Sequence, residues 1–157
     1  TPKKGNNIVE ICFVGRFMKH QRLDVLVKSL KYFEDMSSIR INLIGTGLEA
    51  VEQQIKTLGA DVVNHGFVNR NNIINVLNNF DIAVIAGSPD YQSCMKLYDY
   101  AAAQCAVIAP EIHNLKYWFN KEILFFDKTE KDLFEKLNLL INDRDLREEY
   151  AKKYTIR

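Results

Sequence analysis

Short apolar segments alternate with longer amphipathic segments along almost the whole chain. The apolar segments are rich in valine, isoleucine and phenylalanine, and several end at glycine, which is typical of buried strands followed by turns. In the longer amphipathic segments, apolar residues recur at helical spacing. This spacing predicts helices over about 23–33, 48–58, 73–80, 95–103 and 133–141. The apolar segments themselves predict strands over Ile8–Val14, Ile39–Ile44, Val62–Val63, Ile82–Ala86, Ala106–Ala109 and Leu124–Phe126.

This alternation predicts an α/β fold, a Rossmann-like three-layer α/β/α sandwich with a mainly parallel sheet of about six strands. Segments such as residues 82–86 are apolar throughout, as expected of parallel strands covered by helices on both faces. Tyr117 and Trp118 are expected in the core, and His65 and His113 in loops. Sheets of this class bind ligands at the carboxyl ends of their strands, so the loops after the strands are the candidate site.

Composition and charge narrow the functional classes. The chain has 157 residues, which favours one domain, and its 21 basic and 20 acidic residues give no reason to expect nucleic acid as a partner. The three cysteines and three histidines lack the spacing of a disulfide framework or a metal site, so no metal is expected and a reducing cytoplasm fits. Apolar segments stay shorter than the roughly 18 residues that span a bilayer.

Residues 45–50, GTGLEA, match the G-x-G-x-x-A pattern of dinucleotide-binding proteins. The match follows the second predicted strand, whereas the fingerprint normally follows the first. Asn64 and His65 stand where an acidic residue is expected to bind the ribose. A tight turn leading into a helix is therefore the simpler interpretation, and an NAD-binding module is kept as an alternative.

A basic segment follows the first predicted strand. In FVGRFMKHQR, residues 13–22, Arg16 comes directly after the strand, and Lys19 and Arg22 precede the next helix. Cations at this edge of a sheet, next to a helix N-terminus, suit a phosphate group. An ordinary solvent-exposed turn explains the same residues equally well.

The segment YQSCMKLYDY, residues 91–100, offers an anion site and a carboxylate together. A loop passes into a helix near Ser93–Met95, and the free backbone N–H groups of such a helix start bind anions. Lys96 and Asp99 are three residues apart and share one helix face, from which Asp99 can accept hydrogen bonds from vicinal hydroxyls. The alternative is a surface Lys–Asp pair that contributes only about 0.2–0.5 kcal/mol.

Taken in order, these segments resemble a known family. The chain runs through VGR, LDVLVKSL, IGTG, HGFV, DIAVIAGS and KLYDYAAAQCAVIAP. This order resembles the C-terminal, nucleotide-sugar-binding domain of GT-B glycosyltransferases, and most closely the retaining group-one family that makes bacterial polysaccharides. The resemblance extends from about Ile8 to Tyr150. It makes residues 8–157 the C-terminal domain of a two-domain enzyme and residues 1–7 a linker remnant, with the N-terminal acceptor domain absent.

The resemblance implies an activity for the full-length chain. Such enzymes transfer a hexose, with retention of configuration, from a UDP- or GDP-linked donor to a sugar or lipid-linked acceptor. The donor is a substrate, and no separate cofactor is implied. The acceptor is held by the N-terminal domain, so the isolated domain is expected to be inactive. A cytoplasmic location is expected, with peripheral contact at the inner face of the membrane left open. A diverged, non-catalytic scaffold domain is the second alternative.

The resemblance also assigns roles to residues. Arg16 matches the family's phosphate-binding arginine, which neutralises the leaving diphosphate, and Gly15 precedes it. The helix start at Ser93, Cys94 and Met95 matches backbone contacts to the diphosphate, with Lys96 expected near the phosphates. Asp99 matches the acidic residue that binds the ribose. The loop with Phe67 and Val68 matches the base site.

Three positions expected at the donor site depart from the family pattern. Gln21 replaces a phosphate-binding lysine, and Lys19, Arg22 or Lys96 are the candidates to compensate. Tyr91 replaces a glutamate near the transferred sugar. Asp99 is one methylene shorter than the usual glutamate.

Overall fold

A parallel sheet forms the centre of the computed structural model, which describes residues 7–16, 18–87 and 95–152. Its strand order is β3-β2-β1-β4-β5-β6, and every neighbouring pair is parallel. This confirms the predicted fold class and the number of strands within the described residues. The strands are β1 (Val9–Val14), β2 (Ile39–Ile44), β3 (Asp61–Gly66), β4 (Ile82–Val84), β5 (Ala106–Pro110) and β6 (Leu124–Phe126).

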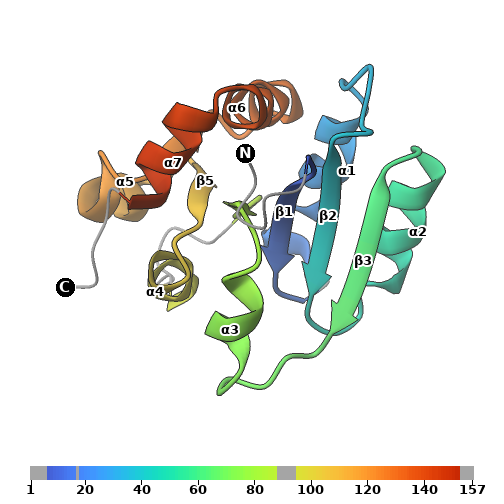
Figure 1. Ribbon diagram of the computed structural model, residues 1–157, viewed down its shortest axis with the longest axis horizontal. Coiled ribbons are helices and arrows are strands. Elements are labelled where there is room, and N and C mark those ends of the chain that lie inside the picture. Colours follow the sequence, from blue (N-terminus) through green and yellow to red (C-terminus); the bar gives the residue numbers. More distant parts are fainter. Residues whose placement is uncertain (1–6, 17, 88–94, 153–157) are drawn as a thin grey trace.

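Helices cover both faces of the sheet, as the continuous apolar strands predict (Figure 1). One apolar cluster packs the sheet against α1, α2 and α6, and a second packs it against α3, α4 and α5. All five residues of β5 are buried, which explains why this segment contains no polar residue. The helices are α1 (Leu23–Leu30), α2 (Glu49–Thr57), α3 (Ile73–Leu77), α4 (Met95–Ala102), α5 (His113–Phe119), α6 (Glu130–Asn142) and α7 (Arg144–Lys152), with a 3-10 helix η1 (Lys19–Gln21) before α1.

Polar side chains near the amino ends of the strands are paired with one another. The buried Glu10 carboxylate accepts hydrogen bonds from Arg40 at 2.7 Å and from Asn42 at 3.0 Å. Asp81 accepts the backbone N–H of Glu10 at 2.8 Å, and Asp61 pairs with Arg40 at 2.8 Å. These contacts join β1, β2, β3 and the start of β4 at the edge opposite the loops that were expected to bind ligand. They account for these buried charges structurally.

The aromatic residues of α5 correct one prediction. Tyr117 and Trp118 were expected in the core, but they are 72% and 64% exposed. The segment forms a short helix whose buried residue is Leu115, while both aromatic side chains face solvent. The two histidines expected in loops lie in regular structure, His65 in β3 and His113 at the start of α5.

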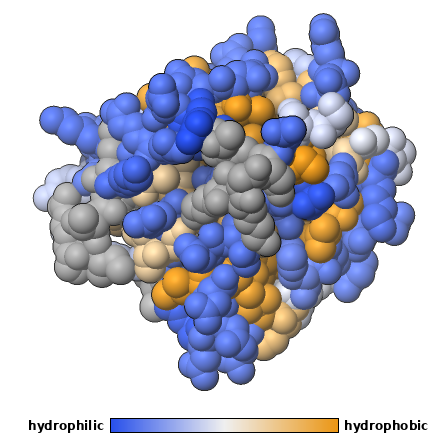
Figure 2. Space-filling model, in the orientation of Figure 1, coloured by the Kyte–Doolittle hydropathy of each residue, from blue (hydrophilic) through white to orange (hydrophobic). Residues whose placement is uncertain are grey.

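The surface and the helix lengths fit an ordinary α/β domain. The face in Figure 2 is mostly hydrophilic, and smaller hydrophobic patches lie between its polar side chains. Among the described helices, none has the length and apolar character needed to cross a membrane.

Candidate functional site at the carboxyl edge of the sheet

The loops after β1, β2 and β3 meet through three glycines. The Gly15 N–H donates to the Ile44 carbonyl at 2.9 Å, and the Gly45 N–H donates to the Gly66 carbonyl at 2.8 Å. Gly45 has a φ of 139°, and a Cβ added to it would lie 1.7 Å from the Gly15 carbonyl oxygen. Only glycine fits there. The first glycine of GTGLEA therefore serves the close approach of two loops, which supports the tight-turn interpretation of this motif.

Lys96 reaches from α4 to the loop after β1. Its ammonium donates to the Gln21 side-chain oxygen at 3.0 Å and lies 5.5 Å from the centre of the Phe13 ring. A Cβ added to Gly15 would be 3.1 Å from this ammonium, so Lys96 lies directly over Gly15. The structure thus brings Gly15, Gln21 and Lys96 together. A cation therefore lies beside Gln21, the position where the resemblance leads one to expect a lysine.

Asp99 lies one turn further along α4 and is buried, with 8% of the residue exposed. Its carboxylate accepts a hydrogen bond from the Arg70 guanidinium, with an Nη1–Oδ2 distance of 2.5 Å. Arg70 comes from the loop after β3 and is mostly exposed. The hydrogen bond and the charge of Asp99 raise the pKa of Arg70 above its ordinary value. The site therefore pairs a buried carboxylate with one exposed arginine side chain.

One face of α4 connects the loops after β1 and β3. Lys96 and Asp99 are three residues apart and share this face. The first contacts the residues after β1, and the second contacts Arg70 after β3. A ligand that follows α4 from the β3 loop to the β1 loop meets a carboxylate first and a cation second.

The remaining predicted residues take different positions. Arg16 is exposed directly after Gly15, and Phe67 is 74% exposed at the end of β3. Val68 is partly buried against the second apolar cluster. Met95 is the first residue of α4. The predicted contacts of Ser93 and Cys94, and the departure at Tyr91, lie outside the described residues.

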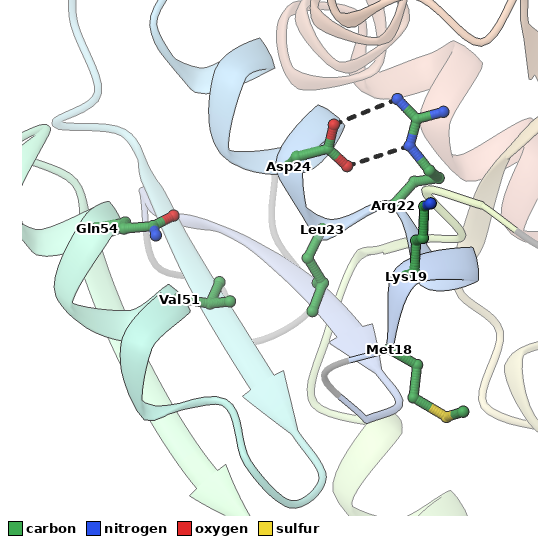
Figure 3. Close-up of a pocket in the computed structure, with 7 residues that line it drawn as sticks. All are labelled: Met18, Lys19, Arg22, Leu23, Asp24, Val51 and Gln54. Atoms are coloured by element: carbon green, nitrogen blue, oxygen red, sulfur yellow. Dashed lines mark hydrogen bonds and ion pairs between the residues drawn. The ribbon is translucent and has the colours of Figure 1, made fainter.

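A hollow of about 470 Å³ lies between η1, the start of α1, and α2 (Figure 3). Arg22 on its rim donates to both carboxylate oxygens of Asp24, at 3.1 and 3.2 Å, which raises the pKa of Arg22 and lowers that of Asp24. Arg22 is thus paired with Asp24, whereas Lys96 contacts Gln21 directly. Lys19 and Arg22, two of the cations considered for phosphate binding, line this hollow, whereas the described residues that the resemblance assigns to the donor site lie at the carboxyl edge, which remains the candidate site. The hollow is lined by Met18, Lys19, Arg22, Leu23, Asp24, Val51 and Gln54.

Sequence patterns missed two contacts of this site. Arg70 was not singled out, because its partner Asp99 is 29 residues away and belongs to another element. The Gln21–Lys96 contact joins residues 75 positions apart. The only available signal for Arg70 was a basic residue shortly after the predicted base-binding stretch.

The family model described as "Glycosyl transferases group 1" matches residues 2–156. The chain therefore belongs to the group 1 glycosyl transferase family, and its fold is that of the C-terminal domain of GT-B glycosyltransferases. Among curated protein sequences, none matches the chain.

Solved structures of glycosyltransferases share this fold. The C-terminal domain of the group 1 family protein LpcC from Francisella tularensis is 22% identical, with a TM-score of 0.78, and the match covers 92% of this chain and 80% of that one. The catalytic domain of cholesterol-α-glucosyltransferase from Helicobacter pylori is 21% identical, with a TM-score of 0.75, covering 92% of this chain and 96% of that one.

HepE from Anabaena, solved in complex with UDP, shares the fold over only part of its length. It is 16% identical, with a TM-score of 0.78, and the match covers 93% of this chain and 42% of that one. The chain thus spans less than half the length of HepE.

Proposed function

We propose that this domain binds the nucleotide diphosphate of a sugar donor at the carboxyl edge of its sheet. In a longer chain with an acceptor-binding domain, it would serve transfer of a hexose to a sugar or lipid-linked acceptor, in polysaccharide or glycoconjugate synthesis. Without that second domain, residues 1–157 would bind nucleotide and transfer nothing.

The observation that supports this proposal most is the order of groups along α4. The exposed loop with Phe67 and Val68, the buried carboxylate of Asp99, and the ammonium of Lys96 over Gly15 follow one another. A nucleoside diphosphate presents a base, vicinal ribose hydroxyls and two phosphates in the same order. A carboxylate is a good acceptor for hydroxyl groups, and a cation near backbone N–H groups is a good partner for phosphate.

The chemistry proposed for this edge is charge neutralisation. In glycosyl transfer the nucleotide diphosphate leaves with the electron pair of the bond to the sugar. Arg16 and Lys96, with the backbone of the β1 loop, would stabilise the negative charge that develops on that leaving group. Because Gln21 carries no charge, Lys96 would take the phosphate-binding role that the family's lysine has at that place.

Calorimetric titration of the domain with UDP, GDP and NAD tests the proposal. We expect UDP or GDP to bind with a dissociation constant of about 0.1–1 mM, equivalent to roughly −5 kcal/mol, and NAD not to bind. The UDP complex of HepE makes UDP the first ligand to try.

The other two outcomes support the alternatives. NAD binding without UDP or GDP binding would contradict the proposal and support a cofactor module built on GTGLEA. A folded domain that binds none of the three would support a diverged scaffold, and titration of a full-length chain would check this. Robust sugar transfer by residues 1–157 alone would contradict the expected division of roles between domains.

A further inference from the structure

The Arg70–Asp99 ion pair joins the loop after β3 to α4. Both residues belong to the described part of the chain, and they lie 29 positions apart in the sequence. Asp99 has a side chain that is 12% exposed, whereas that of Arg70 is 62% exposed. The buried partner is thus fixed by its surroundings, and the exposed partner reaches in from the surface.

A carboxylate this deeply buried requires hydrogen-bond donors, because loss of water around a charge is costly. Arg70 donates to Oδ2, and within the described residues Oδ1 accepts no hydrogen bond. This hydrogen bond joins two charged groups, and such bonds hold their partners more firmly than neutral ones do. Arg70 therefore sets the direction in which Oδ1 and the remaining lone pair of Oδ2 face.

Arg70 is itself held by a tight turn. The Asn69 side chain accepts the N–H of Asn71 at 3.2 Å, and the Asn69 carbonyl accepts the N–H of Asn72 at 2.9 Å. This turn leads directly into α3, which packs against α4. It begins next to Phe67 and Val68, the residues proposed to meet the base. The ion pair consequently fixes the base loop and the ribose carboxylate relative to each other.

We propose that Arg70 is a positioning residue for ribose recognition. Its ion pair orients the short Asp99 side chain toward the 2′ and 3′ hydroxyls of a ribonucleoside diphosphate. This offsets the missing methylene relative to glutamate. The inference rests on the proposed nucleotide-binding function, and it names ribonucleotides, as against deoxyribonucleotides, as the preferred ligand class.

Paired titrations with UDP and 2′-deoxy-UDP test this inference, and GDP with 2′-deoxy-GDP provides a second pair. In Arg70→Gln, which replaces the charged side chain with a shorter polar one, UDP affinity should fall about tenfold, the loss of one charge-assisted contact at the ribose. Because 2′-deoxy-UDP keeps the 3′ hydroxyl, its affinity should fall by a smaller factor, about threefold. Arg70→Lys should recover part of the UDP affinity. The exposed Arg144, which pairs with Glu148 on α7, supplies the matched control, and Arg144→Gln should change neither affinity.

The outcomes separate this inference from the function it rests on. Equal weakening of both ligands by Arg70→Gln would mean that Arg70 contacts the base or phosphates, and tighter UDP binding would mean that it competes with ribose. Either result would overturn the positioning role while leaving nucleotide binding intact. A wild-type domain that binds none of the four nucleotides would overturn the proposed function itself. Thermal melting of each variant establishes that it is folded.

Discussion

Replacing Asp99 with alanine should weaken binding of UDP or GDP about 100-fold. The proposed contacts are two hydrogen bonds from ribose hydroxyls to a carboxylate, and bonds to charged groups contribute about 1.5–3 kcal/mol each. Loss of both therefore gives a change of about 3 kcal/mol or more, which corresponds to at least two powers of ten in affinity. Calorimetric titration measures this change, with displacement by a tighter ligand if direct binding becomes too weak.

The fold should survive this substitution. Arg70 would lose its partner but is 62% exposed, so water can solvate its charge. Asp61→Ala is the matched control, because Asp61 also pairs with an arginine but lies at the opposite, amino edge of the sheet. It should leave nucleotide affinity within about twofold, as expected for a surface ion pair remote from the ligand. Equal binding by wild type and Asp99→Ala would exclude Asp99 from the ribose site.

Substituting alanine for Gly45 should destabilise the domain by about 3 kcal/mol or more. A Cβ at this position would lie 1.7 Å from the Gly15 carbonyl oxygen, and the φ of 139° is one that residues with side chains rarely adopt. Backbone strain of this kind costs about 1–3 kcal/mol, and the clash with a neighbouring backbone adds to it. For a domain of this size, the melting temperature should fall by roughly 10 °C.

Gly59→Ala separates the clash from the strain. Gly59 has a φ of 91°, but a Cβ there would have no heavy atom within 4 Å. It should cost only about 1–2 kcal/mol, the penalty for a left-handed conformation without steric conflict. Calorimetric or circular-dichroism melting of the two variants gives the comparison. Equal losses of stability would show that the approach of Gly45 to Gly15 is not the determining contact.

Local patterns predicted most of the fold because they reflect burial within single elements. The apolar strand β5 and the helical spacing of Leu133, Leu137 and Leu140 on α6 both describe one face of one element. Patterns failed at α5, where an aromatic sequence suggested a core but only Leu115 is buried. Hydrophobic side chains at the surface are common in proteins, and composition alone does not distinguish a buried aromatic residue from an exposed one.

The candidate site was predicted only in its separate parts. Arg16, Lys96 and Asp99 follow from the rule that ligands bind at the carboxyl ends of parallel strands, together with the family resemblance. The contacts that organise them do not follow, because Lys96–Gln21 and Asp99–Arg70 cross between distant segments. A helix pattern shows that residues 96 and 99 share a face, but only the packing of α4 shows which loops that face meets.

We propose that a nucleotide lies along α4 between the β3 and β1 loops, and amide chemical-shift mapping examines this placement residue by residue. The 15N-labelled domain would be titrated with UDP while each backbone amide is followed. We expect the largest shifts at Gly15, at Gly66–Val68 and at Lys96–Asp99. Shifts confined to Met18–Asp24 and Val51–Gln54, around the hollow between α1 and α2, would contradict it, as would the absence of shifts at millimolar UDP and GDP.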